Sequence, residues 1–400
     1  MTKFGLKLSV YNQNYVILPP NANGMVIKRV IEDQIFDLLG SNKVILILGT
    51  RRVGKTFLTN KIRERYQGKV LMLNAEDFDV QEMLRKRSVA NYQRIIGDAG
   101  LLIIDEAQAI PEIGMVLKLM IDSQPQLTIL ATGSSSLDLV NTTGEPLTGR
   151  QYPFILYPIA QLELKQDPVS IRAQLDERLI LGSYPEVFQL QSFKQKESYL
   201  KELAKSYLLK DILAYADIKH SAKLVDLLRL IALQIGAEVS YNELSLKLGI
   251  NKITVEHYLD LLQKVFVLFR LPSYSTNQRK EIAKSSKWYF YDNGIRNAVI
   301  QDFRPATMRS DMGMLWENYI ISERLKRNAY AVEDRQLYFW RNYNQQEVDL
   351  VESYAGQLSA VEIKYGESSR RQKPKAFDLA YPDASFSIVD RDNYLDFICF

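Results

Sequence analysis

The chain has 400 residues, of which 46% are hydrophobic and 24% are charged, and its formal net charge is +4. This composition is typical of a globular protein and argues against a disordered chain, and the length predicts two or three domains. A net charge this small gives no evidence for nucleic-acid binding by itself, so that question depends on where the basic residues gather.

The cysteine and histidine content limits the chemistry that the chain can carry. Cys399 is the single cysteine, which excludes an internal disulfide and a cysteine zinc site. His220 and His257 are the two histidines, so a bound metal has to be held mainly by oxygen atoms, as magnesium is. Because no apolar run approaches the roughly 20 residues of a membrane helix, we expect a cytoplasmic protein without a membrane partner. Residues 1–24 are expected to form an N-terminal arm.

A phosphate-binding motif follows the first predicted strand, residues 44–48. The stretch from Gly49 to Thr56 fits the pattern G-x-x-x-x-G-K-[ST] at every fixed position. In such a loop the backbone N–H groups point at phosphate oxygens, Lys55 reaches the β- and γ-phosphates, and the Thr56 hydroxyl binds magnesium. We therefore predict ATP and Mg²⁺ as cofactors, with these nucleotide-binding residues: Gly49, Thr50, Arg51, Arg52, Val53, Gly54, Lys55, Thr56 and Phe57.

A second predicted strand ends in two acidic residues, in the stretch LLIIDEAQAI. Asp105 is placed to complete the magnesium coordination opposite Thr56, and Glu106 is placed to polarise an attacking water molecule. The alternative is an ordinary surface pair at the end of a strand. The phosphate-binding motif upstream favours the functional interpretation, and Glu106 favours hydrolysis over binding alone.

A third predicted strand, in LTILATGSSS, ends at Thr132 and Ser134, either of which could sense the γ-phosphate; a plain loop is the alternative. Arg150 follows as a candidate catalytic arginine finger, acting within its own subunit or across to a neighbour, unless it is a solvated surface charge. These strand–helix units predict an α/β domain with a parallel sheet over residues 25–160.

The chain resembles a known family in these motifs and in several later stretches. The stretches GTRRVGKT, LLIIDEAQ and ATGSSS, with LTGRQYPFILYPI, are similar to bacterial and archaeal AAA+-type ATPases that carry a C-terminal domain of unknown function. GSYPEVF (182–188), SYLLKDIL (206–213) and KWYFYDNGIRNAV (287–299) match the same family, and the resemblance covers nearly the whole chain after the first 24 or so residues. It implies an ATPase but no settled biological role. AAA+ enzymes usually place asparagine at the sensor strand, where this chain has Thr132.

Residues 161–218 are predicted to form a helical connector or lid, broken at Gly182 and Pro185. Residues 219–299 are predicted to form a winged-helix domain. Its three helical segments have Ser240 and Asn251 as predicted N-caps, followed by two strands.

The charges of this predicted winged helix give a mixed signal. The predicted wing is basic, because it has one acidic residue, Glu281, and four basic residues: Arg279, Lys280, Lys284 and Lys287. Such a wing suits contacts with DNA phosphates. On the predicted recognition helix, however, acidic residues offset the basic ones: Lys252 and Lys264 against Glu256 and Asp260. A module that packs against protein is the alternative.

Residues 300–400 are predicted to form an α/β domain resembling the restriction-endonuclease-like PD-(D/E)xK fold. We expect a helix carrying Glu317, then two successive strands with Asp349 near the end of the first and the Glu362-x-Lys364 motif on the second. Alternate residues of a strand share a face, so Glu362 and Lys364 lie together.

In this interpretation Asp349 and Glu362 share a magnesium ion, Glu317 completes its coordination, and Lys364 orients or activates the water. A structural salt-bridge cluster without chemistry, or a solvated Lys364, is the alternative. The basic run Arg370, Arg371, Lys373 and Lys375 suits DNA phosphates or a solvated helix face.

The sequence thus predicts an α/β protein of three modules: an AAA+-like ATPase core, a helical and winged-helix middle, and a nuclease-like C-terminal domain. The leading hypothesis is a DNA-associated ATPase, with a homo-oligomer if Arg150 acts across subunits. The alternatives are an ATP-gated signalling or defence switch acting through protein contacts, and an ATP-licensed metal-dependent nuclease.

Overall fold

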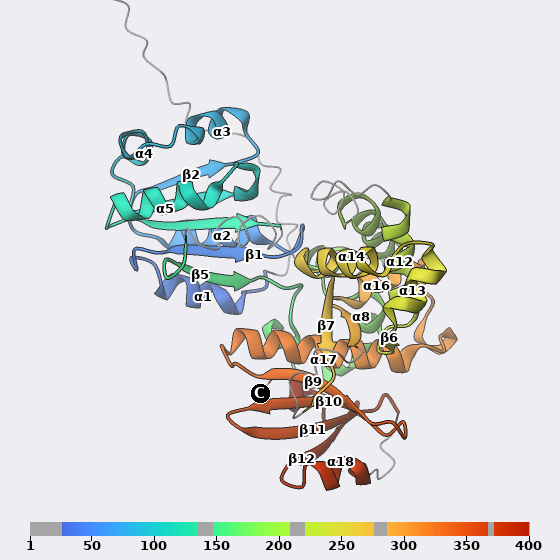
Figure 1. Cartoon of the computed structure of the whole chain (residues 1–400). Helices are drawn as coiled ribbons and strands as arrows, with labels where there is room; N and C mark the ends of the chain where they lie inside the picture. Colours follow the sequence, from blue (N-terminus) through green and yellow to red (C-terminus); the bar gives the residue numbers. More distant parts are fainter. Residues whose placement is uncertain (1–25, 135–146, 209–220, 276–285, 367–371, 400) are drawn as a thin grey trace, which may run out of the picture.

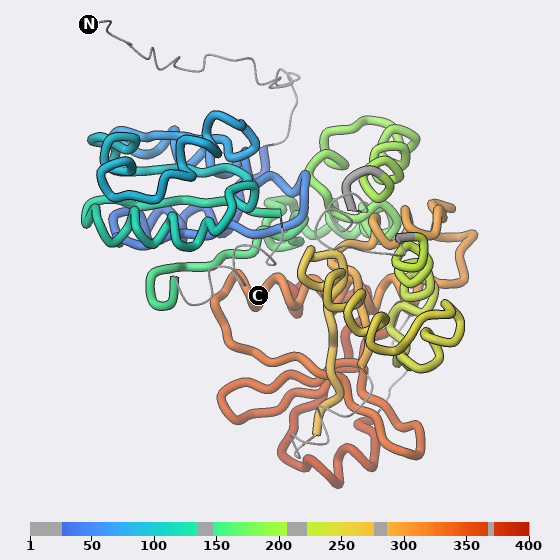
Figure 2. Tube along the Cα trace, turned by 45° about the horizontal axis from the view of Figure 1, so that its top comes forward, coloured from blue at the N-terminus to red at the C-terminus, as the bar shows by residue number. Residues whose placement is uncertain are grey.

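The computed structural model describes residues 26–134, 147–208, 221–275, 286–366 and 372–399. Figure 1 shows the P-loop domain (blue to teal), a mostly helical middle module at its side, and a C-terminal sheet below. Figure 2 shows from a second direction that the long helix α17 (Met312–Tyr330) lies between the P-loop domain and the C-terminal sheet.

The P-loop domain is built on a parallel sheet in the order β2-β3-β4-β1-β5, counted over the described residues. Its central strands β1, β3 and β4 are mostly apolar and are buried along their whole length, as strands covered on both faces require. The predicted α/β parallel sheet is confirmed. The strands are β1 (Val44–Leu48), β2 (Val70–Asn74), β3 (Leu101–Asp105), β4 (Thr128–Gly133) and β5 (Gln151–Ile155), and the helices are α1 (Val30–Asp37), α2 (Lys55–Arg65), α3 (Phe78–Arg85), α4 (Val89–Ile96) and α5 (Ile113–Ser123).

A run of short helices, called the connector below, follows the sheet. Gly182 has a backbone φ of +68° and caps the C-terminal end of α8, and Pro185 begins α9. The helix predicted here is therefore interrupted at these two residues. The connector helices are α7 (Pro168–Ala173), α8 (Leu175–Leu181), α9 (Pro185–Gln189) and α10 (Phe193–Glu202), continued by a π-helical turn, Leu203–Leu208.

The middle module runs helix, strand, two helices, strand, strand, and then another helix. Ser240 and Asn251 cap their helices by accepting hydrogen bonds from backbone N–H groups, and Gly249 adopts the left-handed conformation between them. A small antiparallel sheet has the order β6-β8-β7. The elements are α12 (Ser221–Leu233), β6 (Glu238–Val239), α13 (Tyr241–Leu248), α14 (Lys252–Lys264), β7 (Leu268–Pro272), β8 (Ser286–Phe290) and α16 (Asn293–Ile300).

The C-terminal module is a sheet in the order β12-β11-β10-β9, in which β11 and β12 are parallel and the other pairs antiparallel. The first of the two successive strands predicted here is in fact a hairpin, because residues 342–346 turn the chain. Asp349 consequently lies near the start of β10, as its third residue, and not near the end of a strand that begins at residue 336. The elements after α17 are β9 (Gln336–Arg341), β10 (Glu347–Tyr354), β11 (Gln357–Ile363), α18 (Lys375–Ala380), β12 (Ser385–Val389) and α19 (Tyr394–Cys399).

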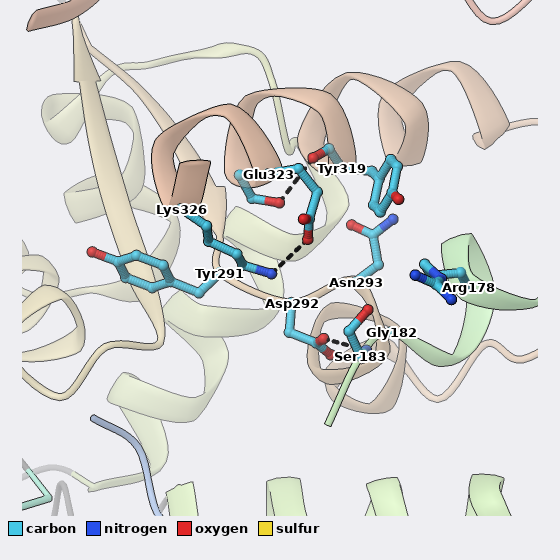
Figure 3. A pocket seen from close by; sticks show the side chains of 10 residues that line it. Arg178, Gly182, Ser183, Tyr291, Asp292, Asn293, Tyr319, Glu323 and Lys326 are labelled. Carbon is cyan, nitrogen blue, oxygen red and sulfur yellow. Dashed lines mark hydrogen bonds and ion pairs between the residues drawn. The ribbon is translucent and has the colours of Figure 1, made fainter. Parts of the chain in front are cut away.

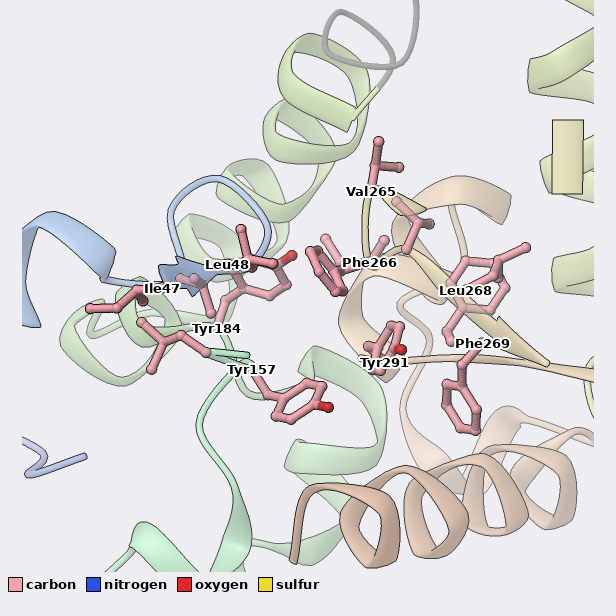
Figure 4. Packing of buried hydrophobic residues seen from close by; sticks show 14 of the residues in the cluster. Ile47, Leu48, Tyr157, Tyr184, Val265, Phe266, Leu268, Phe269 and Tyr291 are labelled. Carbon is pink, nitrogen blue, oxygen red and sulfur yellow. The ribbon is translucent and has the colours of Figure 1, made fainter. Parts of the chain in front are cut away.

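One apolar core runs from the P-loop sheet through the connector and middle module into α17 and one part of the C-terminal sheet. Figure 4 shows part of it, with Tyr184 beside Leu48 at the end of β1, and Tyr157 beside Tyr291. The Tyr157 and Tyr291 rings stack with their centroids 5.5 Å apart. The modules are therefore joined by continuous packing, and a smaller cluster around Trp340 and Phe377 lies within the C-terminal module. In the described parts of the chain, no helix has the length and apolar character needed to cross a bilayer.

Candidate functional site

The loop after β1 has a backbone shape that needs glycine at two positions. A Cβ atom at Gly49 would lie 2.3 Å from the backbone carbonyl oxygen of Leu156, and Gly54 has a backbone φ of +101° at the start of α2. The loop thus passes close to the end of β5 and then presents the N-terminus of α2, a combination typical of phosphate-binding loops.

The amino group of Lys55 lies in this loop. Its Nζ donates to the backbone carbonyl oxygens of Gly49 (2.9 Å) and Thr50 (3.2 Å) and is 3.9 Å from Glu106 Oε1. Lys55 is 5% exposed. A buried ammonium group that is hydrogen-bonded to the loop backbone is placed to neutralise the charge of phosphate oxygens.

The structure brings together the predicted magnesium ligands. Thr56 Oγ1 donates to Asp105 Oδ2 at 2.8 Å, so both oxygen atoms lie side by side at the end of β3. Thr132 Oγ1 donates to the other carboxylate oxygen, Asp105 Oδ1, at 2.5 Å and accepts from the backbone N–H of Glu106 at 3.0 Å. Thr132 therefore fixes the position of both acidic residues, which it can do because β4 lies between β3 and β1.

Glu106 stands at the mouth of the site in an uncommon conformation. Its backbone φ is +51°, in the left-handed region that non-glycine residues seldom adopt. Gln108 donates to Glu106 Oε2 at 2.5 Å and to Ser134 Oγ at 3.3 Å. Backbone strain of this kind occurs most often at functional sites, and here it aims a carboxylate at Lys55.

These residues fit magnesium-bound ATP. The glycines leave room for phosphate groups against the loop, Lys55 would hold the β- and γ-phosphates, and Thr56 with Asp105 would hold the Mg²⁺ ion through hard oxygen ligands. When bound, the metal ion supplies charge neutralisation on the phosphate oxygens. Glu106 lies close enough to this cluster to orient a water molecule.

The remaining predicted nucleotide-binding residues occupy the loop and its flanks. Arg52 has a backbone φ of +63°, and Arg51 lies 3.9 Å from Glu76. Val53 is fully buried beneath the loop, whereas the half-exposed side chain of Phe57 packs against Lys61 on α2.

The prediction that Arg150 acts within its own subunit is wrong. Arg150 precedes β5, and its carbonyl oxygen accepts from the N–H of Val44 at the start of β1. The nucleotide loop follows the other end of β1, so Arg150 lies at the opposite edge of the sheet. Its side chain forms a surface ion pair with Asp122 at 2.7 Å. A role across a subunit interface stays a prediction.

Two residues outside the motif, Tyr184 and Arg29, contact the nucleotide loop, and Tyr330 contacts Arg29; the sequence predicted a role for none of the three. Tyr184 donates to Thr50 Oγ1 at 3.0 Å, and Arg29 donates to the Val53 carbonyl oxygen at 3.1 Å and to Tyr330 at 3.2 Å. The stretch GSYPEVF, which contains Tyr184, was the only signal available in the sequence.

That stretch docks against a second motif, YDNG, in a small cavity between modules (Figure 3). Asp292 accepts from the N–H of Ser183 at 2.6 Å, and burial raises the pKa of its carboxyl group. A Cβ atom at Gly182 would lie 2.1 Å from Asp292 Oδ1. Lys326 and Glu323 of α17 form a buried ion pair at 2.7 Å on the same cavity.

In the C-terminal module, the predicted acidic and lysine residues also lie together. Lys364 Nζ is 2.7 Å from Glu362 and 3.8 Å from Asp349, and Asp349 accepts from the N–H of Ile363 at 2.8 Å. Burial, followed by repulsion from Glu317 and Glu362, raises the pKa of Asp349 to about 7.

The prediction that Lys287 belongs to an exposed basic wing is wrong. Lys287 is 2% exposed and lies 2.5 Å from Glu347 and 3.3 Å from Glu317. Burial alone would lower the pKa of Lys287, but Glu317 and Glu347 outweigh that effect and the pKa is raised. Tyr289 also donates to Glu317 at 2.6 Å.

Glu317 is thus held by two residues of β8. Across the residues that the structure covers, no three acidic or histidine side chains are grouped so that they could hold a metal ion. The predicted coordination by three carboxylates is therefore not formed here.

The exposed charges of α13 and α14 are largely paired. Within the described part of the middle module, the ion pairs along these helices are Lys247–Glu243, Lys252–Glu256 and Lys264–Asp260. Leu246 and Ile253, on either side of the turn between these helices, are 83% and 76% exposed. The wing residues Arg279, Lys280 and Lys284, like Arg370 and Arg371, lie outside the described residues.

Three family models match successive parts of the chain. An AAA domain matches residues 41–165, a domain of unknown function (DUF8612) matches residues 172–306, and another (DUF4143) matches residues 312–397. The first match supports a P-loop ATPase of the AAA type. The other two descriptions assign no activity.

The relatives are themselves uncharacterized. A protein of Mycobacterium tuberculosis is 28% identical over 329 residues, covering 80% of this chain and 70% of the relative. One of Haemophilus influenzae is 22% identical over 373 residues, covering 86% and 88%.

Among solved structures, a Walker-type ATPase of Pyrococcus abyssi is 19% identical, covering 69% of this chain and 96% of that one, with a TM-score of 0.47. The RuvB Holliday junction branch migration motor of Thermotoga maritima is 15% identical, covering 64% and 95%, with a TM-score of 0.29.

Proposed function

We propose that this protein is a magnesium-dependent ATPase that couples its nucleotide state to the middle and C-terminal modules. The observation that carries the proposal is the convergence of Thr56, Asp105, Lys55 and Glu106 at the ends of β1 and β3. Lys55 neutralises phosphate charge, Thr56 and Asp105 hold the metal ion, and Glu106 orients the attacking water. The Thr132 hydroxyl group holds the Asp105 carboxylate and the Glu106 backbone in place through its two hydrogen bonds.

We propose DNA as the partner of the middle and C-terminal modules. The element order of the middle module, with a three-stranded sheet in the order β6-β8-β7 over the described residues, is typical of a winged helix and supports this proposal. The basic residues expected in the wing add to that support, since Lys and Arg side chains bind DNA phosphates.

A protein partner is the second candidate, and two observations on α13 and α14 favour it. The lysines of these helices are paired with acidic neighbours, which lowers their attraction for phosphate groups. The exposed Leu246 and Ile253 offer apolar contact area beside the turn. In this alternative, ATP gates a protein contact in a signalling or defence switch.

A metal-dependent nuclease is the third candidate. It rests first on the proximity of three side chains: Asp349 on β10, Glu362 on β11, and Lys364 directly after β11. It rests second on the element order of this module, which is helix, three strands, helix, strand and resembles the restriction-endonuclease-like fold. DNA cleavage that is lost in Asp349→Ala and Lys364→Ala variants would support this candidate. Retained cleavage in both would exclude this site as the cause.

The test of the partner is the ATP hydrolysis rate measured alone and with single-stranded, duplex and branched DNA, with Lys55→Ala as the blank. DNA stimulation of the rate is the expected result, and the most effective form of DNA names the substrate class. An unchanged rate with all three forms, together with no measurable DNA binding, would overturn the DNA proposal and favour a protein partner.

A further inference from the structure

The nucleotide loop is held near its start by Tyr184 of the connector, and near its other end by Arg29, which is in turn bonded to Tyr330 of α17. Near the start of the loop, the hydroxyl group of Tyr184 donates to Thr50 Oγ1 at 3.0 Å. Tyr184 precedes α9 in the connector, and Tyr184 and Thr50 are 2% and 5% exposed. A hydrogen bond shielded from water in this way fixes the side chain that follows Gly49.

Near the other end, Arg29 holds the loop through its backbone. Its guanidinium group donates to the carbonyl oxygens of Val53 (3.1 Å) and Tyr157 (2.6 Å) and forms an ion pair with Glu163 at 3.0 Å. The hydroxyl oxygen of Tyr330, the last residue of α17, accepts from Arg29 at 3.2 Å and from the Tyr157 N–H at 3.3 Å. Tyr330 therefore orients the guanidinium group that supports the loop.

The loop needs such support because its own backbone is strained. Arg52 has a backbone φ of +63°, which costs free energy in a residue other than glycine. Gly49 is pressed against Leu156, the residue that precedes Tyr157. A loop in this state keeps a phosphate-binding shape only where its surroundings impose that shape, so loss of a supporting contact is expected to weaken nucleotide binding.

Both tyrosines are anchored by contacts between modules. Tyr184 follows Gly182 and Ser183, which dock tightly on the buried Asp292 at the start of α16. Tyr330 ends α17, whose body contacts the connector helix α8, β8 and the C-terminal sheet. The positions of the two hydroxyl groups thus depend on how the middle and C-terminal modules dock. Figure 3 shows Gly182 and Ser183 beside Asp292, and Figure 4 shows Tyr184 beside Leu48.

We propose that Tyr184 and Tyr330 are positioning residues of the nucleotide site, through which docking of the middle and C-terminal modules sets the affinity of the loop for ATP. The proposal rests on the proposed function, because it requires ATP to bind at this loop. By linkage, ATP binding stabilises the docked arrangement to the same extent that docking favours ATP.

The test uses the full-length chain and a fluorescent ATP analogue. Tyr184→Phe and Tyr330→Phe each remove one hydroxyl group and are expected to raise the Kd about three- to tenfold, the range of one buried hydrogen bond. KM should rise with Kd while kcat changes less, because neither hydroxyl group touches the reacting atoms. Tyr92→Phe is the matched control, since it removes a buried hydroxyl group that donates to Leu84 far from the loop.

A double-mutant cycle separates positioning from a general loss of stability. Thr50→Val removes the acceptor of the Tyr184 hydroxyl group, so Thr50→Val combined with Tyr184→Phe should bind ATP no more weakly than the weaker of the two single variants. Fully additive effects would overturn the proposal for Tyr184.

The outcomes also distinguish this proposal from the proposed function. If the wild-type chain binds no ATP, the proposed function fails. If the wild-type chain binds ATP and both tyrosine variants bind it as well as Tyr92→Phe does, the proposed function stands and the positioning role is refuted.

Discussion

Replacing Thr132 by valine tests how the acidic residues of the nucleotide site are held. Valine has nearly the shape of threonine but lacks the hydroxyl group that donates to Asp105 Oδ1 and accepts from the Glu106 N–H. Thr132 is 0% exposed, so water cannot replace the lost group. Thr132→Val therefore leaves two polar partners without their hydrogen bond in the interior of the domain.

The expected magnitude follows from these two contacts. A buried polar group that loses its hydrogen-bond partner costs about 1–3 kcal/mol, so the loss of both contacts should lower the free energy of unfolding by about 2–6 kcal/mol. Loss of the residue that orients a metal-binding carboxylate typically costs about 10–100-fold in activity, so kcat should fall within that range.

Urea unfolding and steady-state ATP hydrolysis measure the two effects. Thr59→Val is the control, because Thr59 is also 0% exposed but its hydroxyl group donates only to the Thr56 carbonyl oxygen within α2. We expect the control to lose about 1 kcal/mol or less and to keep its activity. If Thr132→Val matches Thr59→Val in both measurements, then Thr132 does not hold the acidic pair and the reasoning is wrong.

Three further predictions follow from the described contacts. Gly49→Ala places a Cβ atom 2.3 Å from a backbone carbonyl oxygen, so it should abolish measurable nucleotide binding, whereas Gly313→Ala, which meets nothing within 4 Å, should bind like the wild type. If Arg150 acts across subunits, Arg150→Ala should lower kcat. Mixing Arg150→Ala with the inactive Lys55→Ala variant should then restore part of the ATPase activity, and absence of restoration contradicts a role across subunits. Bonding to Arg304 lowers the pKa of Asp302 to about 2. Because the Arg304 side chain is 62% exposed and solvent screens the pair, wild type should exceed Asp302→Asn in unfolding free energy by about 1 kcal/mol or less at pH 5, and the difference should vanish as the pH falls from about 4 to about 2 in urea titrations. A difference that does not depend on pH would show that another contact of Asp302 is responsible.

The nucleotide site could be predicted from the sequence because its signals are local. The phosphate-binding motif holds its glycines, Lys55 and Thr56 within eight residues, and the buried strand before Asp105 is an unbroken apolar run. Once both strands belong to one parallel sheet, their carboxyl ends meet at the same edge, so Thr56 and Asp105 had to lie close together.

Strand direction explains why the within-subunit role of Arg150 failed. In the sequence, this arginine follows β4, the strand that carries Thr132, and precedes β5. Because β5 runs parallel to β1, it begins at the end of the sheet opposite to the nucleotide loop, and Arg150 lies at that end. The position of an exposed loop relative to that edge depends on which way the next strand runs, and the pattern of residues in β5 does not reveal this.

Long-range contacts between modules could not be predicted. Tyr184 and Tyr330 are separated from Thr50 and Arg29 by 134 and 301 residues, and a buried tyrosine hydroxyl group leaves no periodic pattern in the sequence. Lys287 was misassigned for a related reason, since a lysine beside an exposed basic stretch and a lysine buried against two glutamates look the same in one dimension.

The central claim is that ATP is hydrolysed at the loop between β1 and α2. The most direct test is phosphate release from ATP with Mg²⁺, measured for wild type, Lys55→Ala and Glu106→Gln alongside nucleotide binding. We expect turnover by the wild type, no binding or turnover by Lys55→Ala, and retained binding with at least about 100-fold slower turnover by Glu106→Gln. Equal phosphate release by all three proteins would contradict the assignment of the site.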